Sequence, residues 1–184
     1  FNRAAALQAG LAAGEAIAQH GVDGQRDGLL RLESCATPQR MAEQLHALGL
    51  PPDYVQALDA AAAARLGGLP ASAPAWFFPG GGWIAPAGFA SAWIAQAGDA
   101  VELRLGTDVR ALRRLGTRWQ LLAASGATLG EGDILVLANA FDTAALLGDD
   151  ACNLPLQRIR GQTTELPLAT PGLRLPRLPV AGNG

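Results

Sequence analysis

One stretch constrains the fold of this chain more than any other: residues 75–98, which read AWFFPGGGWIAPAGFASAWIAQAG. The aromatic run Trp76–Phe78 predicts a strand, and Pro79 ends it because proline has no N–H to donate to a ladder. Gly80–Gly82 follow, and a folded protein keeps such a run where the backbone needs a positive φ or a close approach. Trp83–Ala85 then predicts a second strand.

A helix is expected directly after this second strand. Pro86 stands at the first helical position, where proline is accepted, and Gly98 is suited to end the helix as its C-cap. Four apolar residues recur between them at helical spacing: Phe89, Trp93, Ile94 and Ala97. Two interpretations stay open. Either the two strands form a hairpin that leads into a core helix, or the glycines let a flat ligand approach the backbone.

Size and charge narrow the class of protein. A chain of 184 residues, 49% of them hydrophobic, can bury a sizeable core in one domain or one and a part. The formal net charge of -2 gives no support for a basic nucleic-acid-binding module. No apolar run approaches the roughly 20 residues of a membrane span, and no signal peptide is visible. A cytoplasmic location is therefore expected.

The cysteines and histidines do not form a metal-binding pattern. Cys35 and Cys152 lie far apart, without a CxxC or Cys/His spacing, and two buried free thiols are expected. His20 and His46 lie in Ala-rich helical contexts without a carboxylate or cysteine at ligand spacing. No metal site is predicted.

Helices and strands alternate through the first part of the chain. Leu29–Glu33 predicts a strand, and Asp53–Leu58 predicts a short helix or turn. Three helices are expected from composition and capping residues: Phe1–His20, a helix opened by Thr37 and Pro38 that runs to Leu48, and Ala60–Leu66 capped by Asp59.

The second part predicts an antiparallel meander and then a strand of another kind. The meander strands are expected at Val101–Leu105, Asp108–Leu115, Arg118–Ala124 and Ala127–Leu129. Asp133–Ala138 is a continuous apolar run, typical of a parallel strand buried on both faces. A helix capped by Asp142, a strand over Leu156–Leu166 and an irregular segment over Pro167–Pro179 complete the prediction.

No motif by itself identifies a reaction. The chain has no GxGxxG, GxxxxGK, GxSxG or HExxH. A dinucleotide pyrophosphate normally rests on the GxGxxG turn at a helix N-terminus. Its absence argues either against binding of a dinucleotide or for a turn located before residue 1. The chain starts at Phe1 without an initiator Met and ends in a Pro- and Gly-rich run, so we expect an interior piece of a longer polypeptide.

Four segments together resemble one enzyme family. They are FFPGGGWIAPAGFASAWIA, GLLRLES at Gly28–Ser34, DILVLANAFDT at Asp133–Thr143 and LPLQRIRGQTTELP at Leu154–Pro167. Their order and spacing are similar to those of the D-amino-acid oxidase/glycine oxidase family. FFPGGGW, LANAFD and RGQTTELP together favour its tRNA-modifying branch over glycine oxidase.

The resemblance implies a mixed α/β fold: part of an FAD-binding Rossmann-like domain with an inserted antiparallel-sheet substrate domain. Residues 1–98 would be mostly substrate domain, 99–150 the meander and parallel-type strand of the FAD domain, and 151–184 the start of a second, truncated substrate-domain segment.

The resemblance also implies cofactor-binding residues. Val109 would meet the adenine of FAD through its backbone, and Ala138, Asn139 and Ala140 would line the pyrophosphate at the end of the buried strand. Ligands do bind beyond the carboxyl ends of parallel strands, where small residues allow close approach. Val109 as an ordinary strand valine and Asn139 as a turn residue are the alternatives.

A weaker set of residues would face the flavin or the substrate: Gly81, Gly82, Arg160, Gly161 and Gln162. No catalytic residue is identified. Five arginines form a basic cluster that would meet tRNA phosphates or be a solvated sheet face: Arg104, Arg110, Arg113, Arg114 and Arg118.

The expected function is that of an FAD-dependent oxidoreductase fragment. The resemblance implies removal of the carboxymethyl group of carboxymethylaminomethyl-(2-thio)uridine at the tRNA wobble position. The protein would also carry an S-adenosylmethionine-dependent methyltransferase domain, with tRNA as its partner. The alternatives are an oxidase of free glycine or sarcosine, and a structural core without activity of its own.

Overall fold

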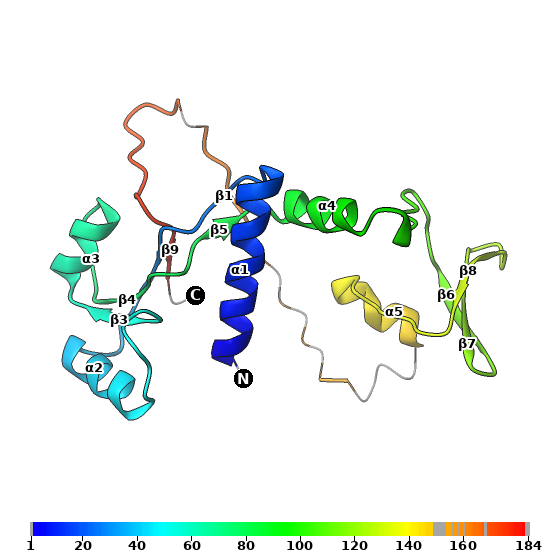
Figure 1. Cartoon of the computed structure of the whole chain (residues 1–184), viewed down its shortest axis with the longest axis horizontal. Coiled ribbons are helices and arrows are strands. Elements are labelled where there is room, and N and C mark those ends of the chain that lie inside the picture. Colours follow the sequence, from blue (N-terminus) through cyan, green and yellow to red (C-terminus); the bar gives the residue numbers. More distant parts are fainter. Residues whose placement is uncertain are drawn as a thin grey trace. The chain divides into compact units, whose positions relative to one another are not determined.

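The computed structural model describes residues 2–148, 154, 155, 157, 159, 161–167 and 169–182. The chain divides into two compact units (Figure 1). Unit 1 joins Phe1–Val101 to Pro167–Gly184, and unit 2 is Glu102–Leu166. The assignment of residues 1–98, 99–150 and 151–184 to substrate and FAD domains stays a prediction.

A four-stranded sheet organises unit 1, in the order β3-β4-β2-β9. Its strands are β2 (Leu29–Leu32), β3 (Gln56–Leu58), β4 (Ala75–Phe78) and β9 (Val180–Ala181). β4 pairs antiparallel with both β2 and β3, while β9 pairs parallel with β2. The central strand β2 therefore has a hydrogen-bonded neighbour on each side.

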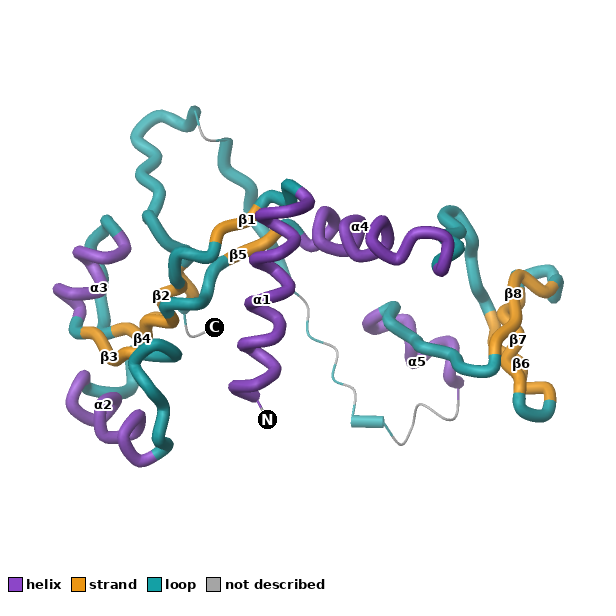
Figure 2. The backbone as a smooth tube through the Cα atoms, in the orientation of Figure 1, coloured by secondary structure: helices purple, strands orange, loops and turns teal. Residues whose placement is uncertain are grey.

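Unit 1 has four helices among the described residues (Figure 2). They are α1 (Asn2–His20), α2 (Pro38–Ala47), α3 (Ala60–Gly67) and α4 (Pro86–Ala97), the last followed by a 3-10 turn, η1 (Gly98–Ala100). The predicted caps of α2 and α3 are confirmed. Thr37 Oγ1 accepts from the Arg40 N–H at 3.3 Å, and Asp59 Oδ1 accepts from the Ala62 N–H at 2.6 Å. Each cap satisfies a backbone donor that the first helical turn leaves unpaired.

Apolar side chains form two core clusters in unit 1. The first lies between the sheet and α3 and contains Leu30, Ala63, Ala75 and Leu178. The second joins α1 to α4 through Ala16, Val22 and Ala92. Every fully buried apolar residue among those described belongs to unit 1.

The hairpin interpretation of the 75–98 stretch is wrong. β4 pairs with β2 and β3, whereas β5 (Trp83–Ile84) pairs with β1 (Gly24–Gln25). The glycine run between them therefore connects two different sheets. None of its three glycines has a positive φ, but a Cβ at Gly82 would overlap the carbonyl oxygen of Gln25. The glycine at position 82 serves a close approach by the chain's own backbone.

Unit 2 contains the predicted meander in a shorter form. β6 (Ala111–Leu115), β7 (Arg118–Leu122) and β8 (Thr128–Gly132) pair antiparallel in sequence order. A register shift falls between Leu121 and Leu122. A 3-10 turn, η2 (Ala140–Asp142), and a short helix, α5 (Thr143–Leu147), follow.

Several predicted strands are absent from the described residues. Val101–Leu105 and Asp133–Ala138 are extended or bent chain without a ladder, and the described part of Leu156–Leu166 has no strand. Ile134 is 85% exposed and Val136 80% exposed. A strand buried on both faces needs neighbouring strands and covering layers, and the described residues supply none to Asp133–Ala138. The apolar pattern alone was not enough.

Unit 1 differs from the prediction at two smaller places. Asp53–Leu58, predicted as a short helix or turn, is a turn followed by strand β3. The described part of Pro167–Pro179 is irregular, as predicted, but it leads into β9, which the sequence analysis did not predict. No helix in the described residues is both long enough and apolar enough to cross a membrane.

Candidate functional site

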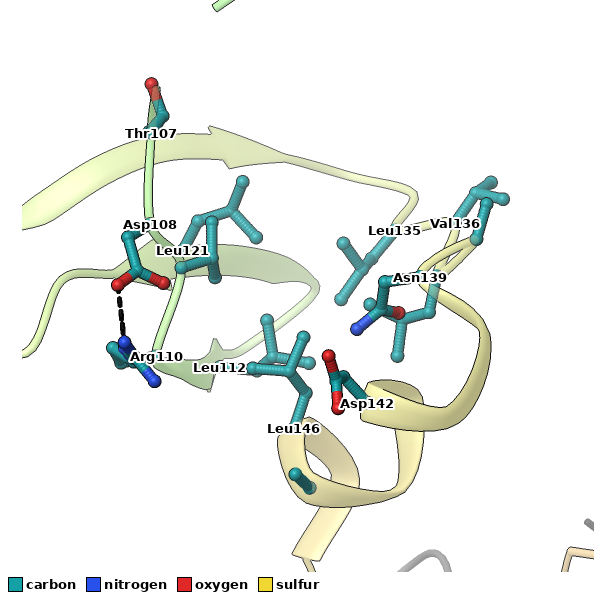
Figure 3. Close-up of a pocket in the computed structure, with 14 residues that line it drawn as sticks. Thr107, Asp108, Arg110, Leu112, Leu121, Leu135, Val136, Asn139, Asp142 and Leu146 are labelled. Carbon is teal, nitrogen blue, oxygen red and sulfur yellow. Dashed lines mark hydrogen bonds and ion pairs between the residues drawn. The ribbon is translucent and has the colours of Figure 1, made fainter. Parts of the chain in front are cut away.

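A pocket of about 630 Å³ in unit 2 brings several predicted cofactor residues together (Figure 3). We call it the Val109 pocket. It lies between the sheet β6-β7 and the chain that runs from residue 135 into α5. Its lining comprises residues 107–110, Leu112, Leu121, residues 135–139, Asp142, Ala145 and Leu146.

Leucine side chains form the interior of the Val109 pocket. Leu112 on β6 and Leu121 on β7 are directly opposed across the strand pair. Leu135 and Leu146 approach from the other side, and Leu137 also lines the pocket. Walls of this kind suit a flat, apolar group such as an aromatic ring system.

Val109 lies one residue beyond the end of the sheet ladder. The Arg110 N–H donates to the Leu122 carbonyl at 2.8 Å, which continues the β6-β7 pairing just past β6. In the part of the chain that the structure describes, the N–H and C=O of Val109 form no backbone hydrogen bond. Val109 is half-buried at the pocket, so its backbone groups are available to a ligand there.

Asn139 turns the chain from the pocket wall into α5. The Thr143 hydroxyl donates to Asn139 Oδ1 at 2.7 Å, and the Asp142 N–H donates to the Asn139 carbonyl at 3.3 Å. Ala140 has φ +51°, a left-handed conformation that costs an alanine about 1–2 kcal/mol. Ala138 and Asn139 line the pocket, whereas Ala140 forms the turn behind it. Asn139 is thus both a turn residue and a lining residue.

The charged groups of the Val109 pocket are mostly acidic. Arg110 Nη2 lies 2.7 Å from Asp108 Oδ2, and both side chains are exposed. Asp142 stands at the N-cap position of α5, as predicted, but its side chain makes no capping hydrogen bond. Its carboxylate is directed toward the leucine-lined interior (Figure 3). Two carboxylates and one guanidinium suit hydroxyl and ring N–H donors better than a phosphate.

The predicted arginine cluster of unit 2 is largely paired. Arg104 Nε lies 2.7 Å from Glu102, and Arg118 lies within ion-pair distance of Glu131 and Asp133. The hydrogen bond from Arg104 and its positive charge lower the pKa of Glu102, and the carboxylate in turn raises the pKa of Arg104. This pairing favours the solvated-face interpretation. A tRNA contact by the cluster stays a prediction.

Gly81 and Gly82 line a second pocket, in unit 1, of about 460 Å³. We call it the glycine-turn pocket. Its other walls come from α1, the segment between β1 and β2, β2, the loop before β3, and the end of β4, and include Arg26, Arg31, Asp53, Tyr54 and Phe78. Gly81 also holds the turn together, because its N–H donates to the Phe78 carbonyl at 3.0 Å. The ligand-approach interpretation of these glycines therefore stays open alongside their structural role.

The remaining predicted residues do not join either pocket. Gly161 and Gln162 lie in exposed, irregular chain and line neither cavity. Arg160 lies outside the described residues, as does Cys152, while Cys35 is exposed rather than buried. Among the described residues, no three His, Cys, Asp or Glu side chains are grouped to hold a metal ion.

Sequence reasoning missed several lining residues. The Leu112–Leu121 pair carried a signal, the alternation of apolar residues along two neighbouring strands. Arg26 and Tyr54 carried none, because only the packing of α1 against the loops brings them to one cavity.

The family of this chain follows from its match to a family model. The family described as FAD dependent oxidoreductase, DAO, matches residues 3–183. The chain belongs to the DAO family of FAD-dependent oxidoreductases. The D-amino-acid oxidase resemblance of the four sequence segments is thereby confirmed.

Within the DAO family, the chain is similar to curated proteins of one name. It is 40% identical over 188 residues to the tRNA 5-methylaminomethyl-2-thiouridine biosynthesis bifunctional protein MnmC of Methylibium petroleiphilum, covering 99% of this chain and 28% of the relative. It is 39% identical over 160 residues to that of Paraburkholderia phytofirmans, covering 85% of this chain and 24% of the relative. The chain thus spans about a quarter of the relatives' length.

Two solved structures of amino-acid oxidases show the same fold. Glycine oxidase from Geobacillus kaustophilus matches 77% of this chain and 40% of its own, with a TM-score of 0.55 at 23% identity. NikD, an unusual amino acid oxidase of nikkomycin biosynthesis, matches 77% of this chain and 38% of its own, with a TM-score of 0.54 at 22% identity. The predicted α/β fold of FAD-dependent oxidases is confirmed.

Proposed function

We propose that this chain is part of an enzyme that removes the carboxymethyl group of carboxymethylaminomethyl-(2-thio)uridine at the tRNA wobble position. The observation that carries the proposal is its identity of about 40% to MnmC proteins along most of its length. The tRNA in the name of these relatives supports tRNA as the substrate. A cytoplasmic location and a methyltransferase domain elsewhere in the protein are part of the proposal. The methyltransferase domain would use S-adenosylmethionine.

The Val109 pocket supports the FAD assignment at the adenine end of the cofactor. Its leucine walls suit the adenine ring, and the free backbone groups of Val109 match the ring's hydrogen-bonding edge. Asp108 and Asp142 are acceptors for the ribose hydroxyls or the exocyclic amine. Ala138 and Asn139 would pass close to the linker toward the pyrophosphate. These residues fit FAD, although the chain contains no GxGxxG turn.

The reaction would break a C–H bond and then a C–N bond of the substrate. The N-linked carboxymethyl carbon loses a hydride equivalent and the nitrogen a proton, which leaves an imine. Water adds to the imine and releases glyoxylate and aminomethyl-uridine. Bound FAD supplies the two-electron acceptor, and the protein holds the carbon in place and excludes water. Gly81 and Gly82, whose turn admits close approach, would lie on the flavin or substrate side.

The first test is to denature the purified protein and identify any released chromophore by absorbance and mass. Release of FAD supports the oxidase proposal. Turnover is then compared with tRNA and with free glycine or sarcosine. Activity only on the free amines would favour the small-amine oxidase instead. A colourless protein that also fails to take up added FAD would rule out both enzymes and leave a structural role.

A paired substitution tests the Val109 pocket itself. Ala138→Leu places a larger side chain in the pocket and should weaken FAD binding about tenfold, equivalent to ~1.4 kcal/mol. Ala124→Leu, on the exposed turn between β7 and β8, adds the same atoms outside the pocket and should leave FAD binding unchanged. Flavin fluorescence titration measures both. Equal affinities for the two variants would remove the pocket from the FAD site.

A further inference from the structure

The glycine-turn pocket combines positive charge with aromatic rings. Arg26 and Arg31 line it, against one carboxylate, Asp53. The Arg3 guanidinium lies 5.7 Å from the centre of the Tyr54 ring and adds a further positive charge at the edge. The chain as a whole has a formal net charge of -2, so this concentration of arginine is local. Its electrostatic field favours an anionic ligand.

Two glycines of α1 make room for the Arg26 side chain. A Cβ on Gly14 would lie 2.5 Å from Arg26 Nη1, and a Cβ on Gly10 would lie 3.0 Å from Nη2. The guanidinium therefore lies close against the helix at these two glycines. Arg26 takes part in none of the ion pairs found among the described residues. Its fork of N–H donors is open to a phosphate or carboxylate.

Aromatic faces stand beside these cations. The Tyr54 and Phe78 rings meet edge to face, with centroids 6.2 Å apart, and both are half-buried in the cavity wall. Gly80–Gly82 form the adjoining wall with bare backbone. A cavity of about 460 Å³ falls within the range of small-ligand sites, which is roughly 300–1,000 Å³.

We propose that the glycine-turn pocket binds a nucleotide, with the phosphate on Arg26 and the base against Tyr54 and Phe78. Arginine beside aromatic rings is the combination by which proteins hold unstacked nucleotides of RNA. The inference rests on the proposed tRNA substrate and adds a binding site for a nucleotide of that RNA.

Binding of an RNA anticodon stem-loop to the purified full-length protein tests the proposal, by fluorescence anisotropy at several salt concentrations. Arg26→Ala should weaken binding about tenfold and reduce the slope of log K against log salt by about 0.7, the loss of one phosphate contact to a single strand. Arg26→Lys keeps the charge and should retain the slope. Arg40→Ala removes an exposed arginine of α2 outside both pockets and should change neither quantity.

Gly14→Ala sharpens the test, because it displaces the Arg26 guanidinium without removing it. Alanine favours the helix over glycine, so the unfolding midpoint should not fall while RNA binding weakens. Uridine monophosphate, titrated alone, separates the two sources of a nucleotide. If uridine monophosphate binds and this binding is lost in Arg26→Ala, the pocket takes single nucleotides. If uridine monophosphate does not bind but RNA binding is weakened in Arg26→Ala, the pocket takes nucleotides within an RNA chain.

Two results would overturn the proposal. One is RNA affinity and salt slope in Arg26→Ala that equal those of the unsubstituted protein. The other is that the stem-loop RNA does not bind, while an acidic peptide does bind and loses affinity in Arg26→Ala. FAD content, measured on the same samples, reports separately on the proposed oxidase function.

Discussion

Two apolar segments of this chain both predict strands, and only one of them forms a strand. Leu29–Leu32 is the central strand β2, hydrogen-bonded to β4 on one side and β9 on the other. Asp133–Ala138 is at least as apolar, yet it lies outside every sheet of the described residues. Leu30 is 2% exposed, and Ile134 is 85% exposed.

The difference between the two segments is in their neighbours. β2 receives its partners from positions 75–78 and 180–181, far away in sequence, and α3 covers it through Ala63. Asp133–Ala138 has the composition of a buried parallel strand, but the described residues place no strand beside it. An apolar run indicates that a segment must be buried to form a stable strand. The strands and helices around the segment determine whether it is buried.

Substitution at one matched position in each segment should give the largest difference. Leu30→Ala removes a side chain from a packed core and should lower the free energy of unfolding by about 2–5 kcal/mol. Ile134→Ala removes an exposed side chain and should change it by less than about 0.5 kcal/mol. Denaturant unfolding of the two variants measures both.

A large loss in Ile134→Ala would break the comparison. It would mean that Ile134 is packed in solution against another surface, which would supply the missing neighbour. Hydrogen exchange gives an independent check, since the amides of β2 should be protected and those of residues 134–138 should exchange quickly.

Helix caps should show a smaller difference between the two units. Asp59→Ala removes the hydrogen bond to the Ala62 N–H in unit 1 and should cost about 1 kcal/mol. Asp142→Ala, at the corresponding position of α5 in unit 2, removes no capping bond and should cost only a few tenths of that. Thermal unfolding of both variants provides the measurement. Equal costs would show that Asp142 caps α5 in solution.

The parts predictable from sequence are those that depend on neighbouring residues. The caps Thr37 and Asp59, the proline that opens α4 and the meander turns at Gly116 and Gly126 all act within a few positions. Strand partners are different, because β5 pairs with β1 rather than with the strand before it. Nothing local to the glycine run distinguishes these two pairings.

The candidate sites follow the same division. Val109, Ala138 and Asn139 could be named because a family resemblance supplied contacts that are far apart in sequence, and the structure brings all three to one pocket. Arg26 and Tyr54 belong to no motif and meet only through the packing of α1. Asp142 was predicted as a cap; it stands at the N-cap position of α5 without a capping hydrogen bond, and its carboxylate is directed toward the pocket.

The smallest expected effect concerns the ion pair between Glu102 and Arg104, whose pKa values are shifted. Arg104 bonds both Glu102 and, at 2.6 Å, the Leu129 carbonyl of β8, so it ties residues 102–104 to the meander. Arg104 lowers the pKa of Glu102 below its ordinary value of 4.5. The contribution of the pair is therefore fully present above pH 4.5 and is lost as the pH falls through the lowered pKa.

Acid should thus loosen this tie in unit 2. An NMR titration of the Glu102 carboxyl should give a pKa that returns toward 4.5 in Arg104→Gln and stays lowered in Arg113→Gln, whose arginine bonds Gln120 instead. Both Glu102 and Arg104 are largely exposed, so added salt should shrink the shift. If the pKa of Glu102 changes neither with added salt nor in Arg104→Gln, the backbone, and not the ion pair, holds residues 102–104 against β8.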